Sequence, residues 1–163
     1  MLRKIFLVLF TLMLAGCAAK TPRFEEKLAE QAAVAFFKFL SSERYSEADR
    51  LYAGNYEPLI SLSEPYTPND HALLWKNACE LSGLQCLAID RIISTERYEK
   101  TEQNPLNAFK IMVEFKDRTG KVFVLGPCCG ASEQEMPPVS QFIVDVIEHD
   151  GEFYVTSLPV FVP

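Results

Sequence analysis

The sequence predicts an α+β fold in which three N-terminal helices pack on an antiparallel sheet of four to five strands. In the first half of the chain, apolar residues recur at spacings of three and four, which is typical of helices with one buried face. From Leu87 onward the spacing changes to two, which indicates strands. Short turn signals join the later segments, so the strands are expected to run antiparallel, with the helices on one face of the sheet.

The first helix is expected to run to Leu40. Thr21 and Pro22 resemble its cap and first residue. Its apolar positions would stack along one side: Leu28, Ala32, Ala35, Phe36, Phe39 and Leu40.

Two shorter helices are expected to follow. Ser46, with Asp49 three residues later, gives a capping-box-like start to the second, and Gly54 is placed to end it. After a loop containing Pro58 and Pro65, the segment 67–70 predicts the start of a third helix, which a glycine at position 83 would close. Core positions are expected at Ala48, Leu51 and Tyr52 in the second helix and at Leu74, Ala78 and Leu81 in the third.

The strands are predicted from alternation of apolar and polar residues. Segments 109–116 and 142–147 alternate in this way, and "DRTG" turns the chain into a further segment, "KVFVLG". Asp150 and Gly151 form a strong hairpin signal that leads into the last segment, 152–161.

The N-terminus has the pattern of a secretory signal. Arg3 and Lys4 precede an apolar run from Ile5 to Leu14, which is too short to remain as a membrane-spanning helix. Small residues and then Cys17 follow.

The stretch Leu14, Ala15, Gly16 and Cys17 resembles the lipobox of bacterial lipoprotein precursors. The resemblance implies cleavage before Cys17, lipidation of its thiol and acylation of its new amine, which together give stable membrane anchoring. Ala18 follows in place of the aspartate that retains some lipoproteins at the inner membrane, so the outer membrane is expected if the cell has one. The alternative is an ordinary secretory signal with a chance cysteine.

The expected domains are a signal peptide at 1–16, a lipidated tether at 17–23 and a single domain at 24–163. Without Arg3 and Lys4 the 16 basic residues fall to 14 against 22 acidic ones, so the net charge of the mature chain is −8. No basic cluster is available to neutralise a phosphate backbone, so nucleic acid is not an expected partner.

The segment "FFKFLSSERYSEADRLYAG" resembles the opening of the nuclear-transport-factor-two-like superfamily. The order of three helices and then curved antiparallel strands is also similar, over most of residues 24–160. The resemblance implies a cone-shaped α+β fold. The enzymes of that superfamily carry acid or base residues inside the cone, but none of those positions can be aligned here with confidence, so it implies no activity.

Four cysteines remain once Cys17 is assigned to lipid: Cys79, Cys86, Cys128 and Cys129. An even number in an oxidising compartment predicts two disulfides. Neighbouring side chains of an extended segment point to opposite faces, so we expect Cys128 and Cys129 each to bond one of Cys79 and Cys86. A Cys128–Cys129 ring is the alternative, with Pro127 and Gly130 permitting the bend.

A zinc site and redox chemistry are the other interpretations of these cysteines. Four thiolates can bind zinc, but the usual ligand spacing is missing, and there is no CxxC motif of the thioredoxin kind. We therefore expect structural disulfides, no metal and no cofactor.

The candidates for catalysis are weaker. Asp90 and Asp145 lie among apolar neighbours on predicted strands, where a buried carboxylate could act as a general base. We expect instead that both aspartates are solvated or form ion pairs with residues such as Arg91 or Lys110.

The two histidines, His71 and His149, are expected at the surface without a partner. Aromatic residues at helical spacing are expected to be core and not pocket lining: Trp75, Phe36, Phe37 and Phe39.

Two functions of different class follow. The first is a lipid-anchored, non-catalytic module of the cell envelope that binds a small apolar ligand or docks to another envelope protein. The second is a small isomerase or dehydratase with Asp90 or Asp145 as the base. A cone filled by apolar side chains favours the module, and a polar group in an open cone favours the enzyme.

Overall fold

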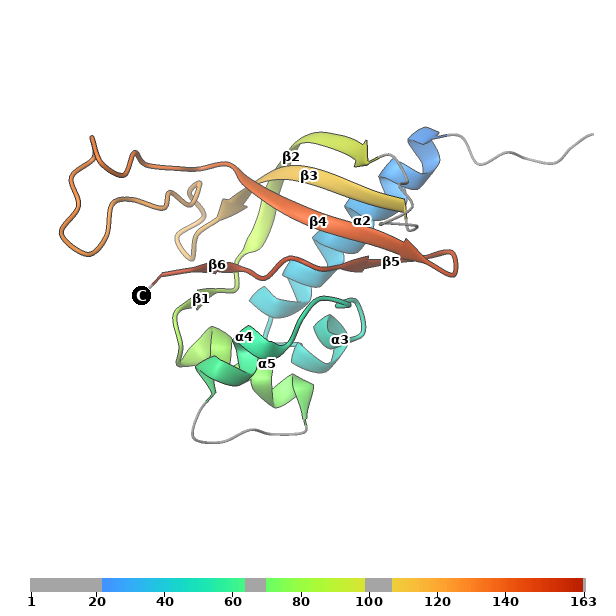
Figure 1. Cartoon of the computed structure of the whole chain (residues 1–163), viewed down its shortest axis with the longest axis horizontal. Coiled ribbons are helices and arrows are strands. Elements are labelled where there is room, and N and C mark those ends of the chain that lie inside the picture. The colour runs from blue at the N-terminus through green and yellow to red at the C-terminus, as the bar shows by residue number, and fades with distance from the viewer. Residues whose placement is uncertain (1–21, 64–69, 99–106, 163) are drawn as a thin grey trace, which may run out of the picture.

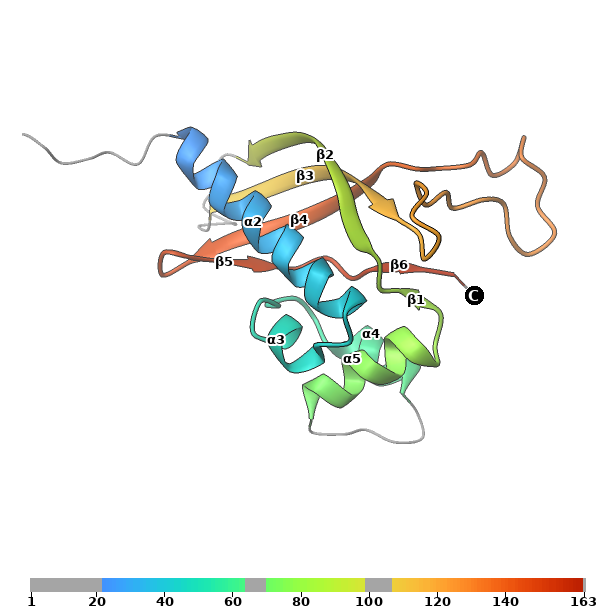
Figure 2. The ribbon, with the colours of Figure 1, turned by 180° about the vertical axis from the view of Figure 1, so that it is seen from behind.

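A computed structural model describes residues 22–63, 70–98 and 107–162. Within these ranges the chain is an α+β structure whose main sheet has four antiparallel strands in the order β2-β3-β4-β5. One long helix, α2, crosses one face of this sheet, and three short helices gather beside one end of α2 (Figures 1 and 2). The predicted fold class and the antiparallel sheet are confirmed.

Helix α2 spans Pro22–Ser41 and packs against β2, β4 and β5. Its buried face lies slightly to one side of the expected stripe, because several expected core positions, such as Leu28 and Phe39, are only half-buried. Full burial of a large apolar side chain on this helix contributes about 1.5–3 kcal/mol to the stability of the fold. The buried residues are Ala29, Ala33, Phe36, Phe37 and Leu40.

Helices α3 (Tyr45–Asp49) and α5 (His71–Glu80) correspond to the second and third predicted helices. Asp70 caps α5 as expected, and its carboxylate accepts hydrogen bonds from the backbone N–H groups of Ala72 and Leu73 at 2.9 and 3.3 Å. Thr21 and residues 64–69, which include Thr67, Pro68 and Pro65, lie outside the described residues.

Four local expectations about the helices are wrong, and the fourth concerns Gly54. Ser46 lies inside α3, and the residue at the cap position, Arg44, makes no side-chain capping bond. The expected loop around Pro58 contains a helix, α4 (Glu57–Leu62), because proline is tolerated in the first turn of a helix. Leu81 follows the last residue of α5 and is 79% exposed, so it is not a core position.

Gly54 does not end a helix, because α3 stops five residues earlier. An added Cβ at Gly54 would overlap the Thr156 carbonyl oxygen and the Tyr52 hydroxyl oxygen. Glycine is therefore needed here for a close approach of the chain to the segment after β5.

The main sheet consists of β2 (Ala88–Tyr98), β3 (Asn107–Lys116), β4 (Phe142–His149) and β5 (Glu152–Val155). The alternation predicted for β3 and β4 is confirmed on the face that meets α2, where the apolar side chains are buried. Asp150 and Gly151 adopt positive φ angles of 54° and 84° in the tight turn between β4 and β5. The buried residues of β3 and β4 on this face are Phe109, Ile111, Val113, Phe115, Val144 and Val146.

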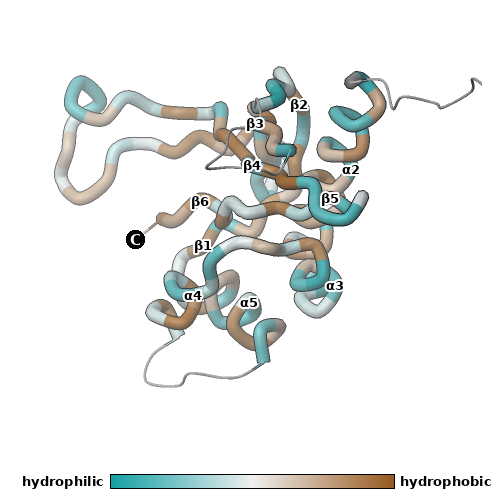
Figure 3. The backbone as a smooth tube through the Cα atoms, turned by 45° about the vertical axis from the view of Figure 1, so that its right-hand side comes forward, coloured by the Kyte–Doolittle hydropathy of each residue, from teal (hydrophilic) through white to brown (hydrophobic). Residues whose placement is uncertain are grey.

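The segment "KVFVLG" does not form a strand of the main sheet. It belongs to a long connection between β3 and β4, residues 117–141, which we call the arm (Figure 3). Leu125 and Val139 exchange two backbone hydrogen bonds of 2.8 and 2.9 Å across the arm. The arm projects from the sheet at the end opposite to the start of α2 (Figures 1 and 2).

The last segment, expected as one continuous strand, is divided. After β5 the chain continues to β6 (Val160–Phe161), which pairs with β1 (Leu84–Gln85) in a separate two-stranded sheet. None of the helices in the described part of the chain has the length and hydropathy of a membrane-spanning segment.

Candidate functional site

The space between α2 and the main sheet, where the resemblance implies a cone, is filled by aromatic and aliphatic side chains. Trp75, Phe36 and Phe37 are fully buried, as the core interpretation predicts. The ring of Phe36 lies 5.5 Å from Trp75, and Phe37 lies 4.9 Å from Phe115, measured between ring centroids. Phe39 is half-buried, and the guanidinium of Arg44 lies over its ring.

Neither candidate general base points into this core. Asp90 is exposed, and its carboxylate forms a 2.7 Å salt bridge with Lys116. Asp145 is half-buried on the outer face of the sheet, because its neighbours Val144 and Val146 occupy the inner face. Its carboxylate accepts a 3.2 Å hydrogen bond from the Ser157 hydroxyl.

Both histidines are exposed, as expected, but His71 has partners that the sequence did not predict. Its ring stacks on Tyr56 with 3.9 Å between centroids, and Nδ1 lies 3.6 Å from the Asp49 carboxylate. Asp49 also accepts a 2.6 Å hydrogen bond from the Tyr56 hydroxyl. His149 lies 3.3 Å from the neighbouring Asp150. In the described residues no three histidine, cysteine or acidic side chains lie together as a metal site would require.

The expected disulfide pairing is wrong. Cys79 and Cys86 bond each other, with their Cα atoms 5.5 Å apart. The chain reverses between them at Gly83, whose φ of +84° only glycine adopts readily, and this brings the end of α5 back against β1. Cys128 and Cys129 have no bond to either of them and are free. Cys17 lies outside the described residues.

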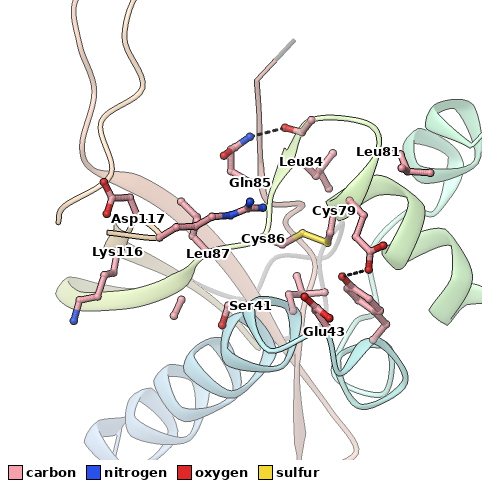
Figure 4. Close-up of a pocket in the computed structure, with 16 residues that line it drawn as sticks. Ser41, Glu43, Cys79, Leu81, Leu84, Gln85, Cys86, Leu87, Lys116 and Asp117 are labelled. Atoms are coloured by element: carbon pink, nitrogen blue, oxygen red, sulfur yellow. Dashed lines mark hydrogen bonds between the residues drawn. A yellow bond between two sulfur atoms is a disulfide. The ribbon is translucent and has the colours of Figure 1, made fainter. Parts of the chain in front are cut away.

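A hollow of about 700 Å³ lies beside this disulfide (Figure 4). Three separate segments meet around it: the end of α2 with the following turn, the end of α5 with β1, and the end of β3. We call it the polar hollow. The Cys79–Cys86 bond lies in its wall, at the centre of the view in Figure 4.

The inner part of the polar hollow is aliphatic. Leu40 and Leu84 are almost fully buried, and Leu87 is 8% exposed, so these side chains give the hollow an apolar inner surface. The charged and polar residues of the lining are Ser41, Glu43, Tyr45, Glu80, Gln85, Lys116, Asp117 and Arg118.

Most of these polar groups already have partners. The Tyr45 hydroxyl donates a 3.1 Å hydrogen bond to Glu80, and Lys116 pairs with Asp90. Asp117 accepts hydrogen bonds from the side chain and backbone of Thr119 and from the backbone N–H of Lys121; the bond from the Thr119 hydroxyl is the main reason that the pKa of Asp117 is lowered.

Glu43 and Arg118 are different. Within residues 22–63, 70–98 and 107–162, no salt bridge engages either side chain. Both side chains line the hollow, where Glu43 raises the pKa of the Tyr45 hydroxyl and Arg118 lowers it. Burial, with smaller contributions from Glu80 and Glu43, raises the pKa of Tyr45 to about 12, so this hydroxyl remains a neutral donor at physiological pH.

Sequence reasoning missed this hollow because its lining comes from three segments far apart in the chain. It also missed Glu114, a buried carboxylate on β3 that accepts a 2.7 Å hydrogen bond from Arg91 across the sheet. The alternation of β3 placed Glu114 on a polar face, but alternation does not tell whether that face is covered. The chain matches no protein-family model, curated protein or solved structure.

Proposed function

We propose that this chain is a lipid-anchored, extracytoplasmic binding module without a catalytic task, and that its ligand occupies the polar hollow. The filled core is the observation that carries the proposal. An isomerase or dehydratase of the kind considered above needs a base inside an open cone, whereas Asp90 and Asp145 lie on the outside of the sheet, with Lys116 and Ser157 as partners.

The anchor is proposed from the N-terminal sequence. A basic start, an apolar run and the stretch Leu14 to Cys17 precede α2, which begins at Pro22. The Cys79–Cys86 disulfide supports an oxidising compartment, because cytosolic proteins seldom keep such bonds. The protein would lie in the cell envelope, at the outer membrane in a cell that has two.

We also propose that the domain is nuclear-transport-factor-two-like, with a curved sheet that folds around α2. The order of elements, helices first and antiparallel strands afterwards, supports this. Irregular pairing between β2 and β3, near Asp90 and Ile93, supports the curvature, because bulges bend a strand.

The proposed ligand is a small zwitterion with an aliphatic body, such as a free aliphatic amino acid or a short peptide. Glu43 and Arg118 offer one negative and one positive charge in the lining of the same hollow, and the leucines below offer apolar surface. A purely apolar ligand would use neither charge, so we replace the small apolar ligand considered from the sequence by one that carries charge at both ends. An envelope protein that inserts such a segment would use the same chemistry.

Ligand binding can be tested by thermal unfolding of the mature, lipidated protein in detergent with millimolar leucine or leucyl-leucine. Binding to the native state raises the melting temperature. The rise should disappear in Arg118→Ala and in Glu43→Gln and persist in Arg23→Ala, which removes an exposed arginine on the first turn of α2. Isocaproate and isoamylamine, which are leucine without its ammonium group and without its carboxylate, should give smaller shifts. Equal shifts in wild type and Arg118→Ala would refute the site.

Anchoring is tested separately by metabolic labelling with palmitate and membrane fractionation. The wild-type protein should carry acyl chains on Cys17 and sediment with membranes, while Cys17→Ser should remain unlabelled and uncleaved. A soluble wild-type product with an unmodified Cys17 thiol would overturn the proposed localisation.

A further inference from the structure

The adjacent cysteines of the arm hold their sulfur atoms in an unusual position. The Sγ atoms of Cys128 and Cys129 lie 2.8 Å apart. Non-bonded carbon atoms keep about 3.5–4.0 Å, and sulfur is larger than carbon, whereas a disulfide bond is about 2.05 Å long. The two sulfurs therefore lie within reach of each other.

The backbone explains how neighbouring side chains come to the same side. Cys129 has a φ of +60° and Gly130 a φ of +88°, both in the left-handed region. In an extended segment the two side chains would point to opposite faces, which is why the sequence favoured two different partners. A left-handed residue is uncommon for cysteine and turns the chain at this point.

The pair lies beside a second, smaller hollow of about 220 Å³. Cys128 is half-buried in its lining, and Cys129 is exposed to solvent. We call it the arm hollow; its wall is apolar and includes Phe123, Leu125, Met136 and Phe161.

Bonding between Cys79 and Cys86 leaves Cys128 and Cys129 without another cysteine partner in the described part of the chain. We propose that Cys128 and Cys129 form a thiol–disulfide exchange site, which alternates between a dithiol and a vicinal disulfide and changes the mouth of the arm hollow as it does so. The electron acceptor is an external disulfide, either of a polypeptide or of a small thiol.

The exchange balances in two steps. The exposed Cys129 thiolate attacks the external disulfide, a bond forms between Cys129 Sγ and one external sulfur, and the other leaves as a thiolate. Cys128 then loses its proton and attacks Cys129 Sγ, which forms the Cys128–Cys129 bond and expels the second external sulfur. The two cysteines lose two electrons and two protons, and the external disulfide becomes two thiols.

The order of the steps follows from the positions of the two sulfurs. The hydrogen bond with Cys129 raises the pKa of Cys128, and burial adds to this, so Cys128 keeps its proton until the first step is complete. Cys129 is the sulfur that an incoming disulfide meets first. Cys128 therefore acts as the resolving thiol.

The test treats the mature protein with a mild reductant and then with oxidised glutathione. We expect the wild type to lose two hydrogen atoms without gaining glutathione, with the loss mapped to the peptide that contains residues 128 and 129. Cys128→Ser keeps the first thiol and removes the second, so it should accumulate a stable glutathione adduct on Cys129. Cys129→Ser should react more slowly, because only the half-buried thiol remains.

The change at the arm hollow is read by NMR of methionine methyl groups. Oxidation should move the signal of Met136, which lines the hollow, and should not move that of Met112, which lies on β3 in the main sheet.

A stable glutathione adduct on the wild type, covalent dimers, or exchange with Cys79 and Cys86 would overturn the proposal, as would thiols that stay unreacted. An unmoved Met136 signal would overturn the coupling to the hollow. None of these readouts depends on the ligand of the polar hollow.

Discussion

At the scale of single residues, the most telling position is Glu114. Its side chain is only 8% exposed, yet it carries a carboxylate on the sheet face away from α2. Arg91 on the neighbouring strand bonds it at 2.7 Å, and the Gln141 amide approaches at 3.5 Å. A buried carboxylate is stable only with such partners, so the pair holds β2, β3 and the end of the arm together.

We predict that Arg91→Ala lowers the free energy of unfolding by about 1–3 kcal/mol, because the buried carboxylate loses its cation. Since Arg91 is itself largely exposed, the loss should lie below that for a fully buried ion pair. Urea unfolding of a double-mutant cycle with Glu114→Gln measures the coupling. If Arg91→Ala cost as much in the Glu114→Gln background as in the wild type, the pairing would carry no energy.

Two tyrosines link stability to alkaline pH. Burial raises the pKa of Tyr52 to about 12, and burial with the Glu80 hydrogen bond does the same for Tyr45, from an ordinary value of 10.0. In the unfolded chain both hydroxyls lose their protons near pH 10, so above that pH the unfolded state binds fewer protons than the folded state. Their contribution is complete below pH 10 and is lost as the pH rises towards about 12.

The expected result is a free energy of unfolding that falls between about pH 10 and about pH 12. Tyr45→Phe and Tyr52→Phe should each make this fall shallower, because phenylalanine does not titrate. Urea midpoints at several alkaline pH values measure the slopes. Slopes that are identical in the wild type and both variants would show that neither hydroxyl is shifted in the native state.

At this scale the sequence predicted burial well in the strands, less well in the helices, and it predicted the partners of charged side chains poorly. Alternation identified Phe109, Ile111 and Val113 as core, because the period of a strand is local information. The cation beside Asp90 is Lys116, and neither Arg91 nor Lys110, because that contact depends on how β2 and β3 align with a bulge. Cysteine pairing likewise depended on the reversal at Gly83.

At the scale of elements, a side-chain cap marks the start of only one of the three short helices of the described residues. Helix α5 begins directly after Asp70, whose carboxylate binds two backbone N–H groups of its first turn. This signal was visible in the sequence. By contrast, α4 has no side-chain cap, and Pro58 lies in its first turn. Because proline occurs both in loops and in the first turn of helices, the sequence predicted a loop at this place.

We predict that Asp70→Ala lowers the free energy of unfolding by about 0.5–2 kcal/mol, with Asp70→Asn much closer to the wild type, because asparagine also caps helices. Both variants leave the exposed charge pattern elsewhere unchanged. Chemical unfolding followed by the fluorescence of Trp75, the one tryptophan of the chain, which is fully buried on α5, reports the change. Equal loss in both variants would mean that the charge of Asp70, and not its capping bonds, supports the helix.

At the scale of the whole molecule, different contacts stabilise the arm and the rest of the domain, which we call the body. The body has one core between α2 and the main sheet, and the Cys79–Cys86 bond ties α5 to β1 beside it. The arm is closed across its middle by the two backbone bonds between Leu125 and Val139. None of residues 126–138 belongs to the core or packs against it. Long connections of this kind are uncommon unless they carry a function.

We therefore predict that the arm can be shortened without loss of the fold. Residues 126–138 would be replaced by Asn-Gly, which joins Leu125 to Val139 through a two-residue hairpin turn. The cost of closing a loop changes by about 0.6 kcal/mol for each doubling of length, so shortening this loop from 13 residues to two should change the free energy of unfolding by less than about 2 kcal/mol. Thermal unfolding and hydrogen exchange of the β3 and β4 amides measure the change in stability.

The variant loses both cysteines of the arm but keeps Arg118 and the Asp117 turn, so zwitterion binding should survive while glutathione exchange disappears. Exchange of the β3 amides at the rate of unfolded chain would instead mean that the arm is part of the folding unit.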